Sequence, residues 1–180
     1  GSEMCIRDRS NAGLPDLYLK LQELSMARPV SGLLTDMVCC PGGDFCSLAN
    51  ARSITVAEDI NRRYKSLDKL ESLGNIDLRI SGCMNSCGHH HIGNIGILGV
   101  DKDGKAFYQL LLGGNSGEKG KASLGKIIAK AFAEDEISDA VENILQHYLS
   151  KRDKNETFRN TVARLGNASF AEAANKARKS

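Results

Sequence analysis

Five of the six cysteines fall in two short stretches of the chain. Cys40 and Cys46 are separated by five residues and Cys83 and Cys87 by three, with 36 residues between the pairs, and Cys39 precedes the first pair directly. Thiolates are soft, anionic ligands, and four of them complete the ligand set of one [4Fe–4S] cube. Because the start of the chain shows no secretory signal, grouped cysteines indicate a metal site before a disulfide framework.

The spacing within each pair predicts a local geometry. Cys83 and Cys87 are four residues apart, so one helical turn would place both side chains on the same face. Cys40 and Cys46 bracket a Pro-Gly-Gly sequence, where glycine lets the backbone turn its N–H groups toward cluster sulfurs. We expect the two stretches to meet, because all four ligands must reach one cluster.

Three other uses of these cysteines stay open on spacing alone. Four thiolates also complete a tetrahedral zinc site, although zinc ribbons usually place two to four residues within a pair. The five residues between Cys40 and Cys46 exceed that spacing. Disulfides and inert buried thiols are the remaining alternatives.

The sequence around the cysteines resembles a known family. The segments CPGGDFCSLA at 40–49 and ISGCMNSCGHHHIGNIG at 80–96 resemble the signature of sulfite and nitrite reductases that use sirohaem. The segments YQLLLGG at 108–114 and FR at 158–159 resemble downstream parts of the same family. The resemblance covers residues 13–170.

This resemblance implies cofactors and a role for each cysteine. Cys40, Cys46 and Cys83 would ligate a [4Fe–4S] cluster, and Cys87 would ligate it and also bridge to the sirohaem iron. Sulfite or nitrite would be reduced there, to sulfide or ammonia, with electrons from a donor such as ferredoxin or a flavoprotein. A shared thiolate would leave the electron no gap to cross between the two metal groups.

The chain also departs from the family pattern. Cys39 stands where the family usually has a small residue, and Met84 stands where proline is common. The complete enzyme of the family has two pseudo-symmetric halves with sirohaem between them, and this chain resembles the second half. We therefore expect it to need the missing N-terminal half and to be inactive alone. The alternatives are an iron–sulfur electron-transfer or accessory module without haem, and a zinc-stabilised structural domain.

Four further side chains are candidates for contacting the cofactors, namely Asn85, His90, Arg52 and Lys119. The two cations could pair with cofactor carboxylates, although an ordinary surface charge is the favoured interpretation of each. Adjacent histidines cannot all face one ion. We therefore interpret the histidines at 89–91 as structural groups or as groups at the edge of a cofactor.

The hydrophobic pattern predicts the elements that must position these residues. Strands alternate with helices, then a hairpin appears, and then helices dominate, which predicts an α+β fold with a mixed β-sheet flanked by helices. Eleven of the 18 glycines lie between positions 82 and 125, which suits either a large buried cofactor or a turn-rich hairpin. We expect helices over 15–26, 48–72, 135–151, 156–165 and 169–178, and strands over 33–39, 77–81, 95–100 and 106–112, with 124–132 ambiguous.

Composition and local charge suggest the domain organisation. Residues 1–12 include Ser-Asn-Ala, which is typical of a cleaved expression tag. We expect residues 13–150 to form the cluster- and sirohaem-binding domain. Residues 151–180 are predicted to form a basic helical extension. The net charge of +2 argues against nucleic acid as a partner. No apolar run approaches the roughly 20 residues of a membrane helix. We expect a cytoplasmic protein.

Overall fold

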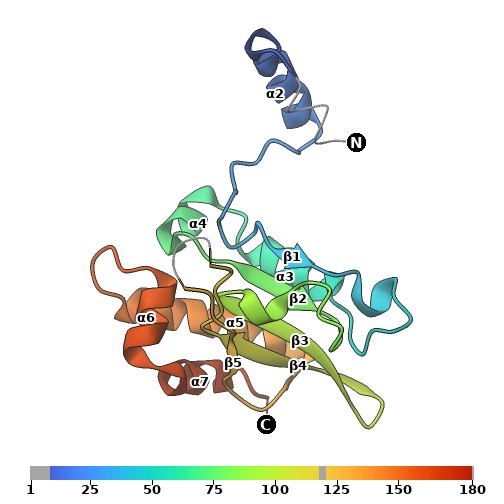
Figure 1. The fold of residues 1–180 in the computed structure, drawn as a ribbon, viewed down its shortest axis with the longest axis vertical. Helices are drawn as coiled ribbons and strands as arrows, with labels where there is room; N and C mark the ends of the chain where they lie inside the picture. Colours follow the sequence, from blue (N-terminus) through green and yellow to red (C-terminus); the bar gives the residue numbers. More distant parts are fainter. Residues whose placement is uncertain (1–8, 118–120, 180) are drawn as a thin grey trace. The chain divides into compact units, whose positions relative to one another are not determined.

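The computed structural model describes residues 9–117 and 121–179 and divides the chain into two compact units, Gly1–Ser31 and Gly32–Ser180 (Figure 1). The first unit contains a short 3₁₀ turn, η1 (Asn11–Gly13), and the helix α2 (Leu14–Glu23). Pro15 sits in the first turn of α2, where its missing N–H costs nothing. None of the residues of α2 is buried.

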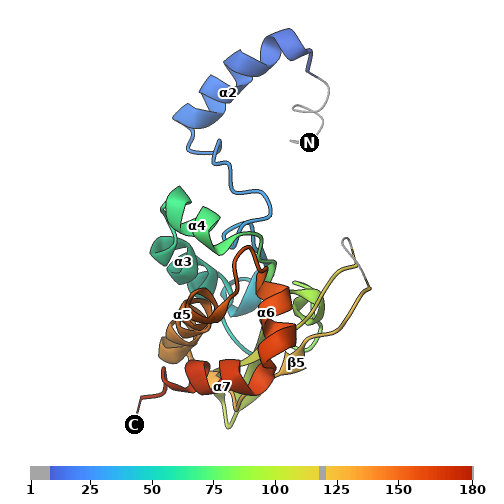
Figure 2. The same ribbon diagram turned by 90° about the vertical axis from the view of Figure 1, so that its left-hand side faces the viewer.

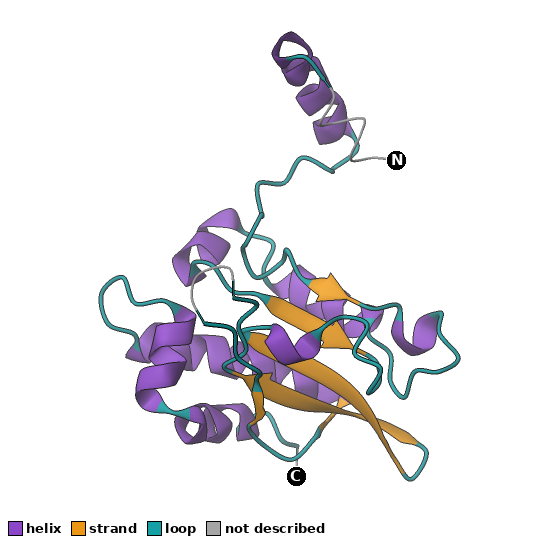
Figure 3. Cartoon of the chain, in the orientation of Figure 1, coloured by secondary structure: helices purple, strands orange, loops and turns teal. Residues whose placement is uncertain are grey.

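A mixed, six-stranded sheet organises the described part of the second unit (Figure 3). Its strand order is β1-β2-β3-β4-β5, and β6 also pairs with β4. The first three strands are parallel, and the pairs that β4 makes are antiparallel. The strands are β1 (Val38–Cys39), β2 (Leu78–Ser81), β3 (Ile95–Lys102), β4 (Lys105–Leu112), β5 (Lys126–Ile127) and β6 (Phe132–Ala133). The predicted mixed sheet with flanking helices is confirmed.

The hairpin between β3 and β4 turns at Asp103 and Gly104. Both residues have positive φ, 54° and 76°, as a two-residue turn of the type I′ class requires. The hairpin expected between the strands over 95–100 and 106–112 is therefore present, and β3 continues two residues further than expected. The ambiguous segment 124–132 contains the short strand β5 and the first residue of β6.

Five helices of the second unit are described: α3 (Ile54–Arg63), α4 (Leu67–Leu73), α5 (Glu134–Lys151), α6 (Phe158–Leu165) and α7 (Asn167–Asn175). The prediction of one helix over 48–72 is wrong, because α3 begins only at Ile54 and is separated from α4. Residues before Ser53 are held in a loop by hydrogen bonds to a distant glycine, as described below. Gly74, with φ of 72°, follows the last residue of α4 and ends the helix.

The basic segment 151–180 packs into the second unit as α6 and α7, which lie beside α5 (Figure 2). Phe158 is fully buried and lies edge to face with Tyr148 and Phe170, at centroid distances of 5.3 and 5.9 Å. These two helices therefore contribute aromatic side chains to the core.

The sheet presents one face to the helices and the other to loops. Leu78 and Ile80 are fully buried, as are Ile137 and Val141 on α5, whereas Arg79 between the two strand residues is half-buried. The short 3₁₀ turn η3 (His90–Ile92) contacts β2 and β3, and Figures 1 and 3 draw it on the face away from α5. Close contact there requires Gly96, because a Cβ atom at that position would lie 2.2 Å from the carbonyl oxygen of His90.

Candidate metal centre

The two cysteine stretches leave the sheet at the same edge. β1 and β2 are parallel neighbours, with Cys39 opposite Ile80, and the Cys40 N–H donates to the carbonyl of Ile80 at 3.1 Å. Because the carboxyl ends of parallel strands meet at one edge, Cys40 and Cys83 follow their strands side by side. The prediction that the two stretches meet is confirmed.

Gly82 joins the two stretches. Its N–H donates to Cys40 Sγ at 3.1 Å, and its carbonyl accepts from the N–H groups of Asn50 and Ala51 at 2.9 and 3.1 Å. A Cβ atom at this position would lie 2.7 Å from the Ala51 carbonyl oxygen and 2.9 Å from Gly42 Cα. Only glycine therefore lets both loops approach this closely.

The first cysteine loop is a tight turn. Residues Gly42–Asp44 form the 3₁₀ turn η2, and the Cys46 N–H donates to the Gly42 carbonyl at 2.9 Å. Gly42 has φ of 59°, so the turn predicted from the Pro-Gly-Gly sequence is confirmed. The hydroxyl of Ser53 lies 3.5 Å from Cys40 Sγ and places a polar group beside that sulfur.

The second cysteine loop differs from the expected helical turn. Ser86 N–H donates to the Cys83 carbonyl at 3.2 Å, and His89 N–H donates to the Ser86 carbonyl at 2.7 Å, which gives two consecutive turns. Ser86 has φ of 58°, a left-handed conformation that no α-helix contains. As a result Cys83 is buried and Cys87 is exposed, so the two thiols meet different environments.

All five described cysteines are free. Among the residues that the structure describes, no three His, Cys, Asp or Glu side chains are placed to hold one metal ion. A zinc site needs four sulfurs about 2.3 Å from a single centre. A cube presents separate irons to its ligands, so the sulfurs need not converge on one point. Zinc and a cluster therefore place different geometric demands on the four sulfurs.

The Cys39 thiol contacts the backbone beside Cys40. Its S–H donates to the carbonyl of Cys40 at 3.2 Å. Burial raises the pKa of Cys39 to about 11, with smaller contributions from the nearby Cys40 and Asp44. The surroundings of Cys39 therefore favour the protonated thiol over the thiolate.

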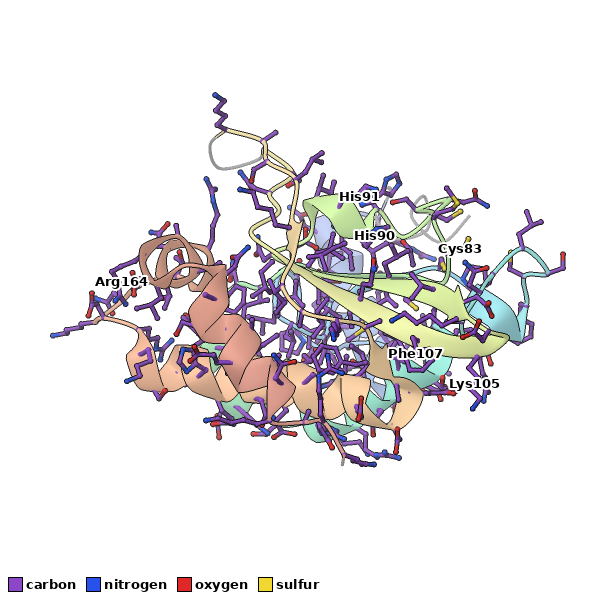
Figure 4. The ribbon with its side chains drawn as sticks, turned by 90° about the horizontal axis from the view of Figure 1, so that it is seen from below. Cys83, His90, His91, Lys105, Phe107 and Arg164 are labelled. Carbon is purple, nitrogen blue, oxygen red and sulfur yellow. The ribbon has the colours of Figure 1, made fainter. Side chains whose placement is uncertain are left out.

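His90 carries a buried nitrogen without a partner. The side chain is fully buried, its Nδ1 lies 3.2 Å from Ser86 Oγ, and its Nε2 has no hydrogen bond in the described part of the chain. Burial, and to a smaller extent His91, lowers the pKa of His90 to about 4, so the ring is neutral at pH 7. Figure 4 shows His90 and His91 on the same side of the sheet as Cys83. An orphaned buried nitrogen here is a group that a bound ligand would satisfy.

The other candidate side chains have distinct surroundings. Arg52 is exposed, and its Nε donates to Asp44 Oδ1 at 2.7 Å, so it lies at the first cysteine loop already paired with a carboxylate. Asn85 is exposed in the turn between Cys83 and Cys87. Lys119 lies outside the described residues.

Large apolar side chains surround the cysteine loops. Phe45 is 82% exposed, Leu48 70% and Met84 82%, and each is one or two residues from a cysteine. These side chains expose apolar area to water beside the cysteines. Sequence reasoning missed this feature and the bridging role of Gly82. The Phe-Cys and Cys-Met neighbours were visible signals, but their exposure was not.

Comparison with known proteins identifies the family. The model of the nitrite and sulphite reductase 4Fe-4S domain matches residues 33–180, which is most of the chain and nearly the whole second unit. The chain belongs to this family. The resemblance inferred from the cysteine signature is therefore confirmed.

The names of the proteins that this chain resembles describe different activities. The ferredoxin–nitrite reductase of Leptolyngbya laminosa is 32% identical over 126 residues, covering 68% of this chain and 24% of the relative. The cobalt-factor III methyltransferase of Priestia megaterium is 31% identical over 155 residues, covering 85% and 26%. The solved Mycobacterium tuberculosis NirA protein aligns with a TM-score of 0.71 and 26% identity, covering 89% of this chain and 31% of NirA. The chain thus spans about a quarter to a third of each relative. None of the helices in the described residues has the length and apolar character needed to cross a membrane.

Proposed function

We propose that this chain is the cofactor-bearing portion of a reductase that converts sulfite to sulfide or nitrite to ammonia, using a [4Fe–4S] cluster and sirohaem. The observation that carries the proposal is the meeting of the two cysteine stretches at Gly82, on one edge of the sheet. Sequence spacing provides the donors, and this contact supports their sharing one cofactor.

Each cysteine has a proposed role that fits its surroundings. Cys40, Cys46 and Cys83 would hold the cluster, and Cys87, the exposed thiol, would also reach the sirohaem iron. The Gly82 N–H already donates to Cys40 Sγ, and such bonds stabilise thiolate charge. When bound, the cluster would supply electrons to sirohaem, where the oxyanion is reduced.

Other side chains would complete the cofactor environment. His90 Nε2, buried and without a partner, would donate to or accept from the bound cofactor, and exposed Asn85 lies beside both cysteines of its loop. Arg52 and Lys119 would meet cofactor carboxylates. The apolar side chains Phe45, Leu48 and Met84 supply a surface for a large flat group and for the missing N-terminal half.

The wider setting of the activity is also proposed. The chain matches only part of each relative, so it would act within a longer protein or with a separate N-terminal half, and alone it would be inactive. Ferredoxin or a flavoprotein would supply electrons, in the cytoplasm.

A second candidate is an iron–sulfur accessory module without haem. The observation that favours it is the similarity to a cobalt-factor III methyltransferase, whose name describes no sulfite or nitrite reduction. The same cysteine site would then hold a cluster for electron transfer or for structure.

Anaerobic reconstitution separates these candidates. The chain is loaded with iron and sulfide, and about four iron and four acid-labile sulfide per chain are expected. Sirohaem is then added, and a Soret band coupled to the cluster supports the reductase. A cluster that forms while sirohaem fails to bind even when the N-terminal half is supplied supports the accessory module. Zinc bound with no sulfide would contradict both candidates.

A further inference from the structure

A cleft of about 710 Å³ lies at the other end of the parallel strands, where β2 and β3 begin. Four β2 residues, each rising about 3.3 Å, separate this end from the cysteine loops. The volume falls in the usual range for small-molecule sites, about 300–1,000 Å³. Its lining combines apolar surface with polar side chains, including Asp36, Asp77, Arg79, Asn94, Asn115 and Thr157.

Arg79 is a cation of this cleft that its neighbour Asp77 holds in place. Its side chain is 19% exposed, and its Nε donates to both carboxylate oxygens of Asp77, at 3.0 and 2.8 Å. Within the described residues these bonds use Nε alone. The two terminal nitrogens of the guanidinium, which form the fork that binds oxyanions, are thus left for a ligand.

Two asparagines fix the walls around Arg79. Asn94 accepts from the Asp77 N–H at 3.0 Å and donates to the Gly114 carbonyl at 3.1 Å, which ties two loops together. Asn115 is 7% exposed and donates to the Lys121 carbonyl at 2.8 Å. The guanidinium therefore stands in a preorganised site, which lowers the entropy cost of binding.

The charges of the lining limit the class of ligand. Asp36 and Asp77 balance Arg79 and Arg159 in formal charge, so the cleft as a whole does not favour a polyanion. Side chains of Asn75, Thr157 and Asn160 add hydrogen-bonding groups suited to hydroxyls. A single oxyanion on a hydroxylated small molecule matches this set.

We propose that this cleft binds a small hydroxylated molecule carrying one carboxylate or phosphate group, with the Arg79 guanidinium as the anchor of that group. The site is separate from the cysteine loops and does not depend on a cluster. The proposal therefore stands or fails independently of the proposed reductase function.

Calorimetric titration of the full chain, without added iron, tests the proposal with gluconate as the carboxylate probe and glycerol 3-phosphate as the phosphate probe. We expect saturable binding of at least one probe, and the tighter one identifies the anionic group. Arg79→Gln should weaken it at least about tenfold, and Arg79→Lys several-fold, because lysine keeps the charge but loses the fork. Arg62→Gln is the matched control, since Arg62 is an exposed arginine that pairs with Asp59, and it should bind like the parent chain.

Amide chemical shifts of the unsubstituted chain provide a readout that needs no variant. With the tighter probe, the amides of Asp77, Arg79, Asn94 and Asn115 should shift, and those of the cysteine loops should not. The proposal is overturned if neither probe binds saturably, if Arg79→Gln binds as well as the parent, or if the shifts lie elsewhere.

Discussion

Replacing Gly82 by alanine would place a Cβ atom 2.7 Å from the Ala51 carbonyl oxygen and 2.9 Å from Gly42 Cα. Both neighbours are backbone atoms, so neither can move aside as a flexible side chain would. Overpacking of this kind costs roughly 1–3 kcal/mol. Strain at the Gly82 carbonyl, which accepts from Asn50 and Ala51, adds about 1 kcal/mol for each hydrogen bond lost.

We therefore expect Gly82→Ala to lower the free energy of unfolding by about 2–4 kcal/mol. Urea unfolding followed by circular dichroism measures this change. The local effect is read from thiol labelling with mass spectrometry, because Cys83 is only 8% exposed in the parent chain. Separation of the loops should make Cys83 react much faster, while exposed Cys87 reacts quickly in both proteins.

Gly43→Ala is the matched control, in the first cysteine loop that Gly82 contacts. A Cβ atom at Gly43 would lie 3.5 Å from the nearest atoms of Ala51, an ordinary contact, so stability and Cys83 labelling should stay close to the parent values. The reasoning about Gly82 would be refuted if its alanine variant were as stable as the control and Cys83 stayed protected.

Three further predictions concern single side chains. In the complete enzyme, Cys87→Ser should disturb the absorption spectra of both the cluster and sirohaem, whereas Cys39→Ser should leave both spectra unchanged. If the cluster and sirohaem stayed coupled in the Cys87→Ser variant, the bridging role of Cys87 would be contradicted. Burial lowers the pKa of His90 to about 4 in the folded state, whereas the unfolded chain binds a proton at this residue near pH 6.5. The free energy of unfolding should therefore fall as the pH drops from 6.5 toward about 4. His90→Gln should flatten that part of the pH profile, and an unchanged slope would count against the buried neutral ring. The Arg164 side chain, followed by the Asp153 N–H, holds the pKa of Glu156 at about 2, so this carboxylate stabilises the fold above pH 4.5 and the benefit is lost as pH falls toward 2. Glu156→Gln should therefore lessen acid destabilisation in urea titrations between pH 4.5 and 2, and an identical profile would argue against the ion pair.

The sequence by itself determined the features that depend on local interactions. Asp103 and Gly104 accept positive φ readily, so the hairpin was visible from two residues. The apolar period of 135–151 matched the buried face of α5, and Gly74 marked the end of α4. The cysteine spacing with its flanking residues was sufficient to identify the family, because the ligand chemistry of a cluster restricts which residues stand near it.

The tertiary structure alone decided where distant segments touch. Residues 48–53 have a helical pattern, yet Gly82 holds Asn50 and Ala51 in a loop from more than 30 positions away in the sequence. Ser86 interrupts the expected helical turn between Cys83 and Cys87. Arg79 and the neighbouring loops line one cleft because the parallel pairing of β2 and β3 places the amino-terminal ends of these strands side by side. Periodicity and propensity report on neighbours within a few residues, whereas these contacts depend on strand order and on backbone hydrogen bonds that no local pattern records.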